Sequence, residues 1–242
     1  MMRTPGPRPV TGRGIAEACP ATASFLVPAP DNWPHWDRWP GTPAIGATSR
    51  MERFLSPSEL ASLGLAAVGE GVLIDRAAVF INPGCIRIGS RTRIDAFCLI
   101  TATDHGVAIG RMVHLGPGCQ IFGGGGAVTL EDFTCLSGRT SAYTTCDDLV
   151  DGHLINPTIP AAYRRVQCGS VTLRRHAAVG CGSVVLPGVE LGYGASVGAL
   201  TLVRKSVPEC EVWQGVPARK VGMRNAERLR ELEAKLLAEY PD

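Results

Sequence analysis

The sequence predicts an all-β fold, a parallel β-helix built from six-residue repeats. Three observations predict it: aliphatic residues recur every six positions, glycine and proline are abundant, and aromatic residues are scarce. The chain of 242 residues holds 29 glycines and 18 prolines, whereas aromatic residues make up only 6%. A thin solenoid needs a corner after every short strand and has no room inside for bulky rings, so this composition fits the fold.

The repeat is the strongest of these signals. Fourteen of fifteen positions at this spacing are Ile, Leu or Val, although the chain holds only 54 such residues. Three hexads, 18 residues, bring the chain back above its start, and the coils then stack ~4.8 Å apart as parallel strands. The period does not determine the hand of the helix, and the general crossover rule would favour a right-handed one. The positions are Ile88, Ile94, Ile100, Ile109, Leu115, Ile121, Leu130, Leu136, Ala142, Leu173, Val179, Val185, Leu191, Val197 and Val203.

The segment before the repeat divides into two parts. Residues 1–50 are rich in proline, contain a tryptophan cluster at 33–39 and show no period, so we expect an extended or mobile arm. A short helix should follow, because Ser56 is a suitable N-cap, Pro57 suits the first helical position and Glu59 lies three residues after the cap.

The rest of the chain is predicted to be one body with a helical tail. Residues 51–222 form the β-helix, interrupted by a long loop at 149–170. Residues 223–242 carry leucines at spacings of three and four among charged residues, which predicts an amphipathic helix. We expect this helix to cover the open end of the β-helix, whose strand edges would otherwise be exposed.

A cluster of polar residues and glycines at one corner predicts a site. Three coils have 21 residues instead of 18, and aligning them places His105, Gly126 and Asp147 in one column. The glycine run at 123–126 should leave a gap between polar neighbours, and the loop 149–170 follows at once. Binding and catalytic residues are disproportionately carried by such loops.

Charge and composition exclude several classes of protein. A net charge of +2 gives no electrostatic footprint for nucleic acid, and no run of about 18 apolar residues predicts a membrane span. The N-terminus lacks the apolar core of a signal peptide. Nine cysteines without a CxxC pair indicate reduced, mostly buried thiols rather than zinc or redox motifs. We therefore expect a cytoplasmic protein.

Several segments together resemble a known family. The hexads, the segment GSVVLPGV at 182–189 and GVPAR at 215–219 are similar to the left-handed β-helix, hexapeptide-repeat acyltransferases. The stretch 136–160 resembles the galactoside-type or sugar O-acetyltransferase subgroup, and so does the short helix within 54–64. The resemblance covers about residues 52–222 and leaves the arm outside.

The resemblance implies a homotrimer that binds acetyl-CoA as co-substrate in the groove between subunits. It implies direct transfer of an acetyl group to a hydroxyl of a sugar or sugar-like acceptor, assisted by a general base, with no metal. Three alternatives stay open. One is an N-acetyltransferase acting on a nucleotide-linked amino sugar or a secondary metabolite, and another is a catalytically silent scaffold. The third is a zinc enzyme of the γ-class carbonic anhydrase type, which the five histidines disfavour because they lack paired ligand spacing.

The resemblance also implies catalytic residues, with one departure from the family pattern. The family histidine that acts as base corresponds to Asp147, and a carboxylate of ordinary pKa is a poor base for a sugar hydroxyl. We therefore expect His114 to be the base, oriented across a subunit interface by Asp147 or Asp148. The residues expected to bind the acceptor are Gly126, His105, His153 and Asn156.

The C-terminal coils carry the residues that match the family's coenzyme site. Cys181 and Ala199 match backbone positions along the pantetheine arm. Two dibasic pairs match positions near the phosphates, where cationic side chains suit a polyanion. These pairs are Arg204–Lys205 and Arg219–Lys220.

Overall fold

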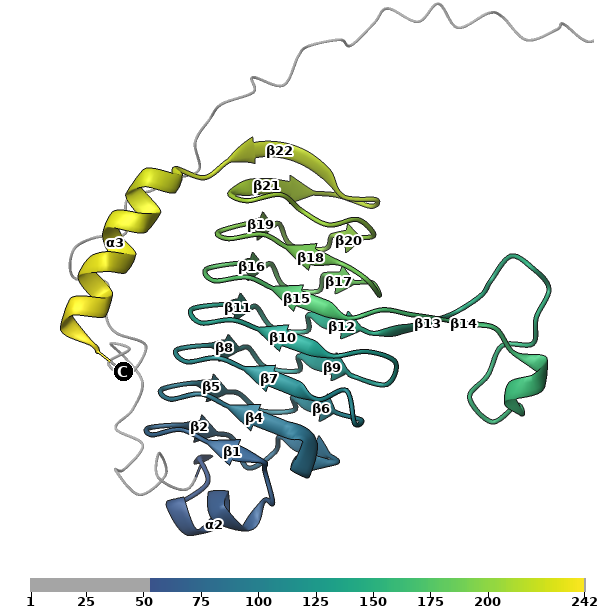
Figure 1. The fold of residues 1–242 in the computed structure, drawn as a ribbon, viewed down its shortest axis with the longest axis horizontal. Coiled ribbons are helices and arrows are strands. Elements are labelled where there is room, and N and C mark those ends of the chain that lie inside the picture. Colours follow the sequence, from purple (N-terminus) through teal and green to yellow (C-terminus); the bar gives the residue numbers. More distant parts are fainter. Residues whose placement is uncertain (1–52, 242) are drawn as a thin grey trace, which may run out of the picture. The chain divides into compact units, whose positions relative to one another are not determined.

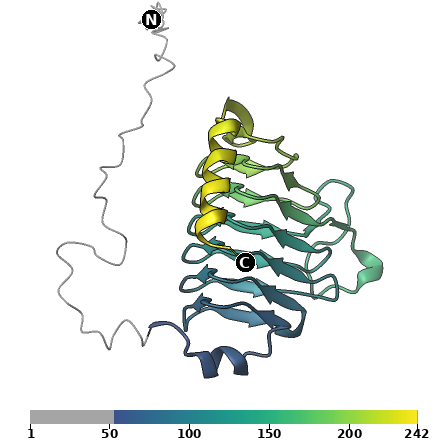
Figure 2. The ribbon, with the colours of Figure 1, turned by 60° about the vertical axis from the view of Figure 1, so that its left-hand side comes forward.

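The computed structural model describes residues 53–241, which form a parallel β-helix of short strands stacked coil upon coil (Figures 1 and 2). The arm predicted at 1–50 lies outside the described residues. Three sheets, here called the first, second and third faces, run along the stack, which confirms the predicted fold class. The first face contains β1 (Ala67–Val68), β4 (Ile86–Ile88), β7 (Val107–Ile109), β10 (Val128–Leu130), β15 (Val171–Leu173) and β18 (Glu190–Leu191).

The other two faces are built in the same way. The second face contains β2 (Leu73–Ile74), β5 (Arg93–Ile94), β8 (His114–Leu115), β11 (Cys135–Leu136), β16 (Ala178–Val179), β19 (Ser196–Val197), β21 (Glu211–Gln214) and β22 (Arg219–Met223). The third face contains β3 (Val79–Ile81), β6 (Leu99–Thr101), β9 (Gln120–Phe122), β12 (Ser141–Tyr143), β17 (Val184–Val185) and β20 (Leu202–Val203).

The hexad aliphatics form the core, as predicted. All fifteen positions are buried, and Leu115, Leu136 and Val185 have no exposed area. Equivalent residues of successive coils pair in parallel and in register, as Ile88 does with Ile109. Each fully buried aliphatic side chain contributes ~1.5–3 kcal/mol relative to exposure, so the repeat itself supplies most of the driving force for folding.

The corners place glycines and larger residues in the left-handed conformation. At the corner between the first and second faces Gly71 and Gly194 have φ of 64° and 63°, and the equivalent residues Met112, Phe133 and His176 have φ of 50°, 64° and 59°. The backbone N–H of Met112, Phe133 and His176 donates to a carbonyl of the preceding coil, which holds each residue in this region. Glycine is also needed for close approach: a Cβ at Gly180 would lie 2.4 Å from the backbone nitrogen of Ala199.

The N-terminal end carries the predicted short helix. Helix α2 (Pro57–Ser62) begins after Ser56, whose hydroxyl accepts from the backbone N–H of Glu59. The Glu59 carboxylate accepts in return from the backbone N–H of Ser56, which completes a capping box. A 3-10 turn, η2 (Pro83–Cys85), lies at a corner of the next coil.

One long excursion interrupts the stack after β12 (Figure 1). The chain runs out as β13 (Thr145–Asp147) and returns antiparallel as β14 (Val166–Cys168), with the 3-10 turn η3 (Ala161–Tyr163) between them. The backbone N–H of Gly169 donates to the carbonyl of Thr144 over 3.0 Å and closes the base of this hairpin. The departure from the coil therefore begins at 145, earlier than the loop predicted at 149–170.

Helix α3 (Ala226–Glu239) begins after the N-cap Asn225, within the segment predicted to be helical. The prediction that it covers the open end of the β-helix was wrong. It runs along the side of the β-helix rather than over its end (Figure 2). It contacts corners of separate coils, since Tyr193 donates to Glu233 over 2.6 Å and Arg91 lies 5.1 Å from the Tyr240 ring. The last parallel strand, β21, is instead paired by the antiparallel β22. Within residues 53–241 no helix has the length and apolar character needed to cross a membrane.

Candidate active site

The base of the β13–β14 hairpin holds a cavity of about 410 Å³. Asp147 lines it, and its Oδ1 accepts from Nη2 of Arg164 over 3.1 Å. Both side chains are mostly buried, with 23% of Asp147 and 17% of Arg164 exposed. The wall of the cavity therefore carries an ion pair that is largely shielded from solvent. The remaining lining residues are Tyr143, Thr145, Cys146, Pro157, Val166, Val184 and Leu186.

Asp148 lies next to this cavity but organises the loop. Its Oδ1 accepts from the backbone N–H groups of Val150 and Asp151 over 2.9 and 3.3 Å, and its Oδ2 lies 3.6 Å from Nε of Arg165. The hydrogen bond from Val150 is the largest cause that lowers the pKa of Asp148. This buried carboxylate therefore stays ionised and is committed to the turn that starts the loop.

His114 lies on the second face and has a different carboxylate partner from the one expected. Its Nε2 is 2.9 Å from Oδ2 of Asp95, and its Nδ1 is 3.8 Å from Sγ of Cys135. The hydrogen bond with Asp95, followed by that with Cys135, raises the pKa of His114 to about 9. The imidazole of a single chain is thus a cation at neutral pH. Asp147 and Asp148 contact arginines instead, and their approach to His114 from another subunit stays a prediction.

The expected column of His105, Gly126 and Asp147 does not continue through the third coil. A Cβ at Gly126 would lie 2.7 Å from the backbone nitrogen of Ser170, because the returning chain occupies the next position. The gap predicted at the glycine run was therefore wrong. A Cβ at Gly125, for example, would lie 2.4 Å from the Thr145 side chain. The glycines allow the hairpin to pack closely against the coil.

The remaining acceptor-site candidates are dispersed. His105 lines a separate hollow of about 210 Å³ on the first face. His153 and Asn156 are exposed on the hairpin loop, where Oδ1 of Asn156 accepts from the backbone N–H of Thr158 over 2.9 Å. His153 is near enough to Asp148 to help lower its pKa, although less than the backbone hydrogen bonds do. Their roles in binding an acceptor stay predictions.

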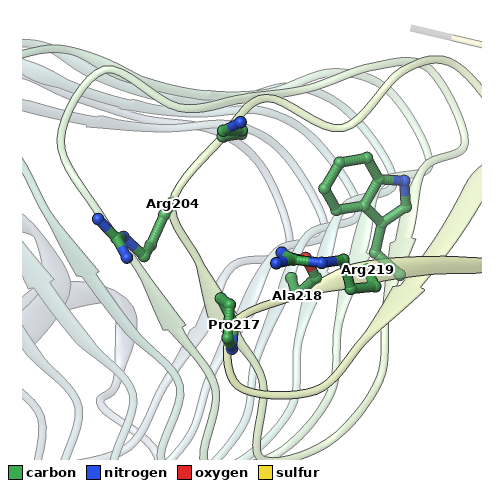
Figure 3. A pocket seen from close by; sticks show the side chains of 6 residues that line it. Arg204, Pro217, Ala218 and Arg219 are labelled. Atoms are coloured by element: carbon green, nitrogen blue, oxygen red, sulfur yellow. The ribbon is translucent and has the colours of Figure 1, made fainter.

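The basic residues at the C-terminal coils converge in part. Arg204, Lys205 and Arg219 line one cavity of about 280 Å³ (Figure 3). The rest of its lining is Trp213, Pro217 and Ala218. Lys220 does not line it, because its Nζ pairs with Oε1 of Glu211 over 2.7 Å. Three cations around a cavity beside an indole suit a phosphorylated ligand with a flat ring.

Cys181 and Ala199 lie at one corner in consecutive coils. Both are exposed, and the backbone N–H of Leu200 donates to the carbonyl of Cys181 over 2.9 Å. This corner follows the second face, so it belongs to the same edge of the stack as Asp95. No group of three or more His, Cys, Asp or Glu side chains suited to a metal ion occurs within residues 53–241.

Sequence reasoning missed Asp95 and Cys135, although a signal for both was present. Asp95 directly follows the buried Ile94, one of the acidic residues that come after hexad aliphatics. Cys135 lies 21 residues after His114, which is one coil of the longer kind. Applying the coil period to His114 would have placed the three side chains together.

Comparison with known proteins identifies the family, although no family model matches the chain. The dTDP-4-amino-4,6-dideoxy-D-glucose acyltransferase of Escherichia coli is 35% identical over 181 residues, 75% of this chain and 93% of that protein. A protein of Escherichia coli K12 named for lipopolysaccharide O-acetyl transfer, WbbJ, is 38% identical over 72 residues, 30% of this chain and 37% of that one.

Solved structures agree with this result. AntD, an N-acyltransferase from Bacillus cereus, was solved in complex with dTDP and 3-hydroxybutyryl-CoA. It superposes with a TM-score of 0.75 at 35% identity, covering 79% of this chain and all of that one (100%). An AntD variant in complex with dTDP-4-amino-4,6-dideoxyglucose and coenzyme A gives a TM-score of 0.73 at 36% identity, covering 78% and 99%. With its hexad core and stacked coils, the chain belongs to the hexapeptide-repeat acyltransferase family.

Proposed function

We propose that this chain transfers an acyl group, acetyl in the simplest case, from acyl-CoA to a sugar or sugar-like acceptor. The observation that carries the proposal is the pair of separate cavities, one lined by three cations and one lined by the Asp147–Arg164 ion pair. The cavity around Arg204, Lys205 and Arg219 suits the phosphates of a coenzyme. The cavity around Asp147 suits an acceptor that carries hydroxyl or ammonium groups.

The acceptor atom follows from the protonation states at these sites. A sugar hydroxyl needs a strong base at the moment of attack, whereas an amine is nucleophilic once it has lost one proton. The cavity of Asp147 is lined by no histidine, and His114 is protonated at neutral pH. These facts favour an amine, and a nucleotide-linked amino sugar is the acceptor we test first. The E. coli and B. cereus relatives, whose names specify such chemistry, support this choice.

A hydroxyl acceptor is the second candidate. The shared stretch with WbbJ supports it, as does the resemblance of 136–160 to the galactoside-type subgroup. In this case His114 would need to lose its proton before it could act as the base. The product would then be an O-acetylated sugar of the kind found in surface polysaccharides.

Assembly and location belong to the same proposal. A homotrimer would bring the β13–β14 hairpin of one subunit to the second face of another, and so join Asp147 to His114. In this arrangement the β-helix of the described residues forms the catalytic body and helix α3 the supporting tail. A chain that uses acyl-CoA and nucleotide sugars would work in the cytoplasm, where both are made.

The test measures acyl transfer by the full-length protein. Purified chain is incubated with acetyl-CoA and either dTDP-4-amino-4,6-dideoxyglucose or a panel of free sugars and galactosides. Because the chain has nine cysteines, free CoA is quantified by chromatography rather than with a thiol reagent. We expect CoA release and an N-acetylated product with the amino sugar. An O-acetylated product would select the second candidate, and no release above hydrolysis with any acceptor would indicate a silent scaffold.

A further inference from the structure

The outer row of the second face brings a thiol, an imidazole and a carboxylate together. Arg93, His114, Cys135 and Ala178 follow one another in register on β5, β8, β11 and β16. Neighbouring strands in a parallel sheet are ~4.8 Å apart, so outer side chains of successive strands in this row are neighbours. The imidazole of His114 therefore lies between charged groups on one side and the thiol of Cys135 on the other.

The charged side determines the orientation of the imidazole. Asp95 is buried, with 4% of its side chain exposed, and its Oδ1 accepts from Nε of Arg93 at 2.8 Å and Nη2 of Arg53 at 3.1 Å. These two arginines occupy one carboxylate oxygen and leave Oδ2 to His114 Nε2 at 2.9 Å. A buried carboxylate held on both oxygens fixes the ring, as the third member of a nucleophile–base–carboxylate set does.

The fixed ring directs its other nitrogen at a sulfur. Nδ1 of His114 is 3.8 Å from Sγ of Cys135, within hydrogen-bonding distance for sulfur. Both groups are accessible, because Cys135 is only partly buried and 43% of the His114 side chain is exposed. The next residue in the row is Ala178, whose methyl group leaves the far side of the thiol uncrowded.

Among the cysteines of residues 53–241, Cys135 is the one that has a histidine as hydrogen-bond partner. The thiols of Cys98 and Cys119 are buried and donate to backbone carbonyls of the next coil. Cys168 and Cys181 are exposed, but neither has a histidine as hydrogen-bond partner. Only the thiolate form of cysteine is a good nucleophile, and a neighbouring imidazolium favours that form.

We propose that Cys135, His114 and Asp95 form a nucleophilic thiol site that accepts the acyl group of an acyl thioester. Because His114 is already protonated at neutral pH, the thiol loses its proton to solvent, the imidazolium stabilises the resulting thiolate, and the thiolate attacks the thioester carbonyl. The bond between the carbonyl carbon and the coenzyme sulfur then breaks, and the coenzyme thiolate takes a proton from solvent. The products are S-acyl-Cys135 and free CoA, so one thioester replaces another without any redox change. The choice of acyl-CoA as the donor rests on the proposed function.

Two measurements on the full chain test the site. The first uses iodoacetamide at neutral pH with peptide mass spectrometry, and needs no acyl-CoA. We expect Cys135 to be alkylated about tenfold or more faster than Cys168, the internal control, and His114→Gln to remove the difference. The second incubates the protein with acetyl-CoA without an acceptor, and we expect a 42-dalton acetyl mass on the peptide of Cys135 but not on that of Cys168 (about 42 Da for exchange of H for acetyl).

The outcomes separate this inference from the proposed function. Alkylation of Cys135 no faster than that of Cys168 overturns the inference, and so does an acetyl-free Cys135 after incubation with acetyl-CoA. The same protein sample is then assayed with the amino sugar. Product formation without acetyl-Cys135 would leave the proposed function standing while this inference fails. Both measurements on the wild-type protein test the inference even if the His114→Gln variant fails to fold.

Discussion

Replacing Asp95 by Asn should lower the proton affinity of His114 strongly. In the native chain Oδ2 of Asp95 lies 2.9 Å from Nε2 of His114, and this hydrogen bond is the main cause that raises the pKa of His114 to about 9. Asn keeps the size of the side chain but removes the charge. The pKa of His114 should then fall toward the ordinary value of about 6.5.

The size of the effect follows from these values. A fall from about 9 to about 6.5 corresponds to roughly 3.4 kcal/mol of net preference for the charged imidazole in the fold, of which the hydrogen bond with Asp95 is the largest cause. Because 43% of the His114 side chain is exposed, solvent screening reduces the net contribution to stability to about 1 kcal/mol. The folded chain binds the proton more tightly than the unfolded chain. The contribution is therefore complete below about pH 6.5 and is lost as the pH rises through about 9.

The assay is an NMR titration of the histidine ring protons between pH 5 and 10, on native chain and Asp95→Asn. The ring signals of His153, an exposed residue of the loop, serve as the internal control for a general change in structure. Urea unfolding at pH 6 and pH 9.5 checks the sign, since the native chain should lose stability between them while Asp95→Asn should not. A native His114 that titrates near 6.5 would refute the reasoning.

Three further predictions concern the core, the corners and the basic cavity. Leu136→Ala removes a side chain with no exposed area and should cost about 2–5 kcal/mol in urea unfolding; a loss below 1 kcal/mol would contradict the assigned core. Gly180→Ala should cost about 1–3 kcal/mol, because its Cβ would lie 2.4 Å from the backbone nitrogen of Ala199. Gly222→Ala, with no atom within 4 Å of its Cβ, is the matched control and should leave the melting temperature unchanged. Reversing both charges in Arg204→Glu/Lys205→Glu should raise the KM for acetyl-CoA about tenfold or more without changing the oligomeric state, and an unchanged KM would exclude this cavity as the coenzyme site.

Local patterns explain why so much of the fold was predictable. A buried aliphatic every six residues can be satisfied only by a coil of three short strands, so Ile94, Leu115 and Leu136 were placed correctly before any contact was known. The N-cap Ser56 with Glu59 and the leucine spacing of α3 are equally local signals. Each depends on residues within one or two turns of the chain.

Errors arose where the period was carried across an interruption. The column from His105 to Asp147 assumed that the third coil continues in register, but the chain leaves at Thr144 and rejoins at Gly169. The position above Gly126 therefore belongs to the returning chain. The same interruption moved Asp147 onto the hairpin, where it meets Arg164 rather than a histidine.

The repeat, the class of fold and the family were determined by the sequence alone, because burial of one aliphatic per hexad is a property of neighbouring residues. The tertiary structure decided which polar groups meet. His114 joins Asp95 and Cys135 because stacked coils bring together residues about 20 positions apart. Arg219 lines the basic cavity and Lys220 does not, because alternate residues of β22 point to opposite sides of the strand. The Lys220 ammonium group pairs with Glu211 instead. The contacts of His114 join residues about one coil apart, so they follow only once the length and the register of each coil are known.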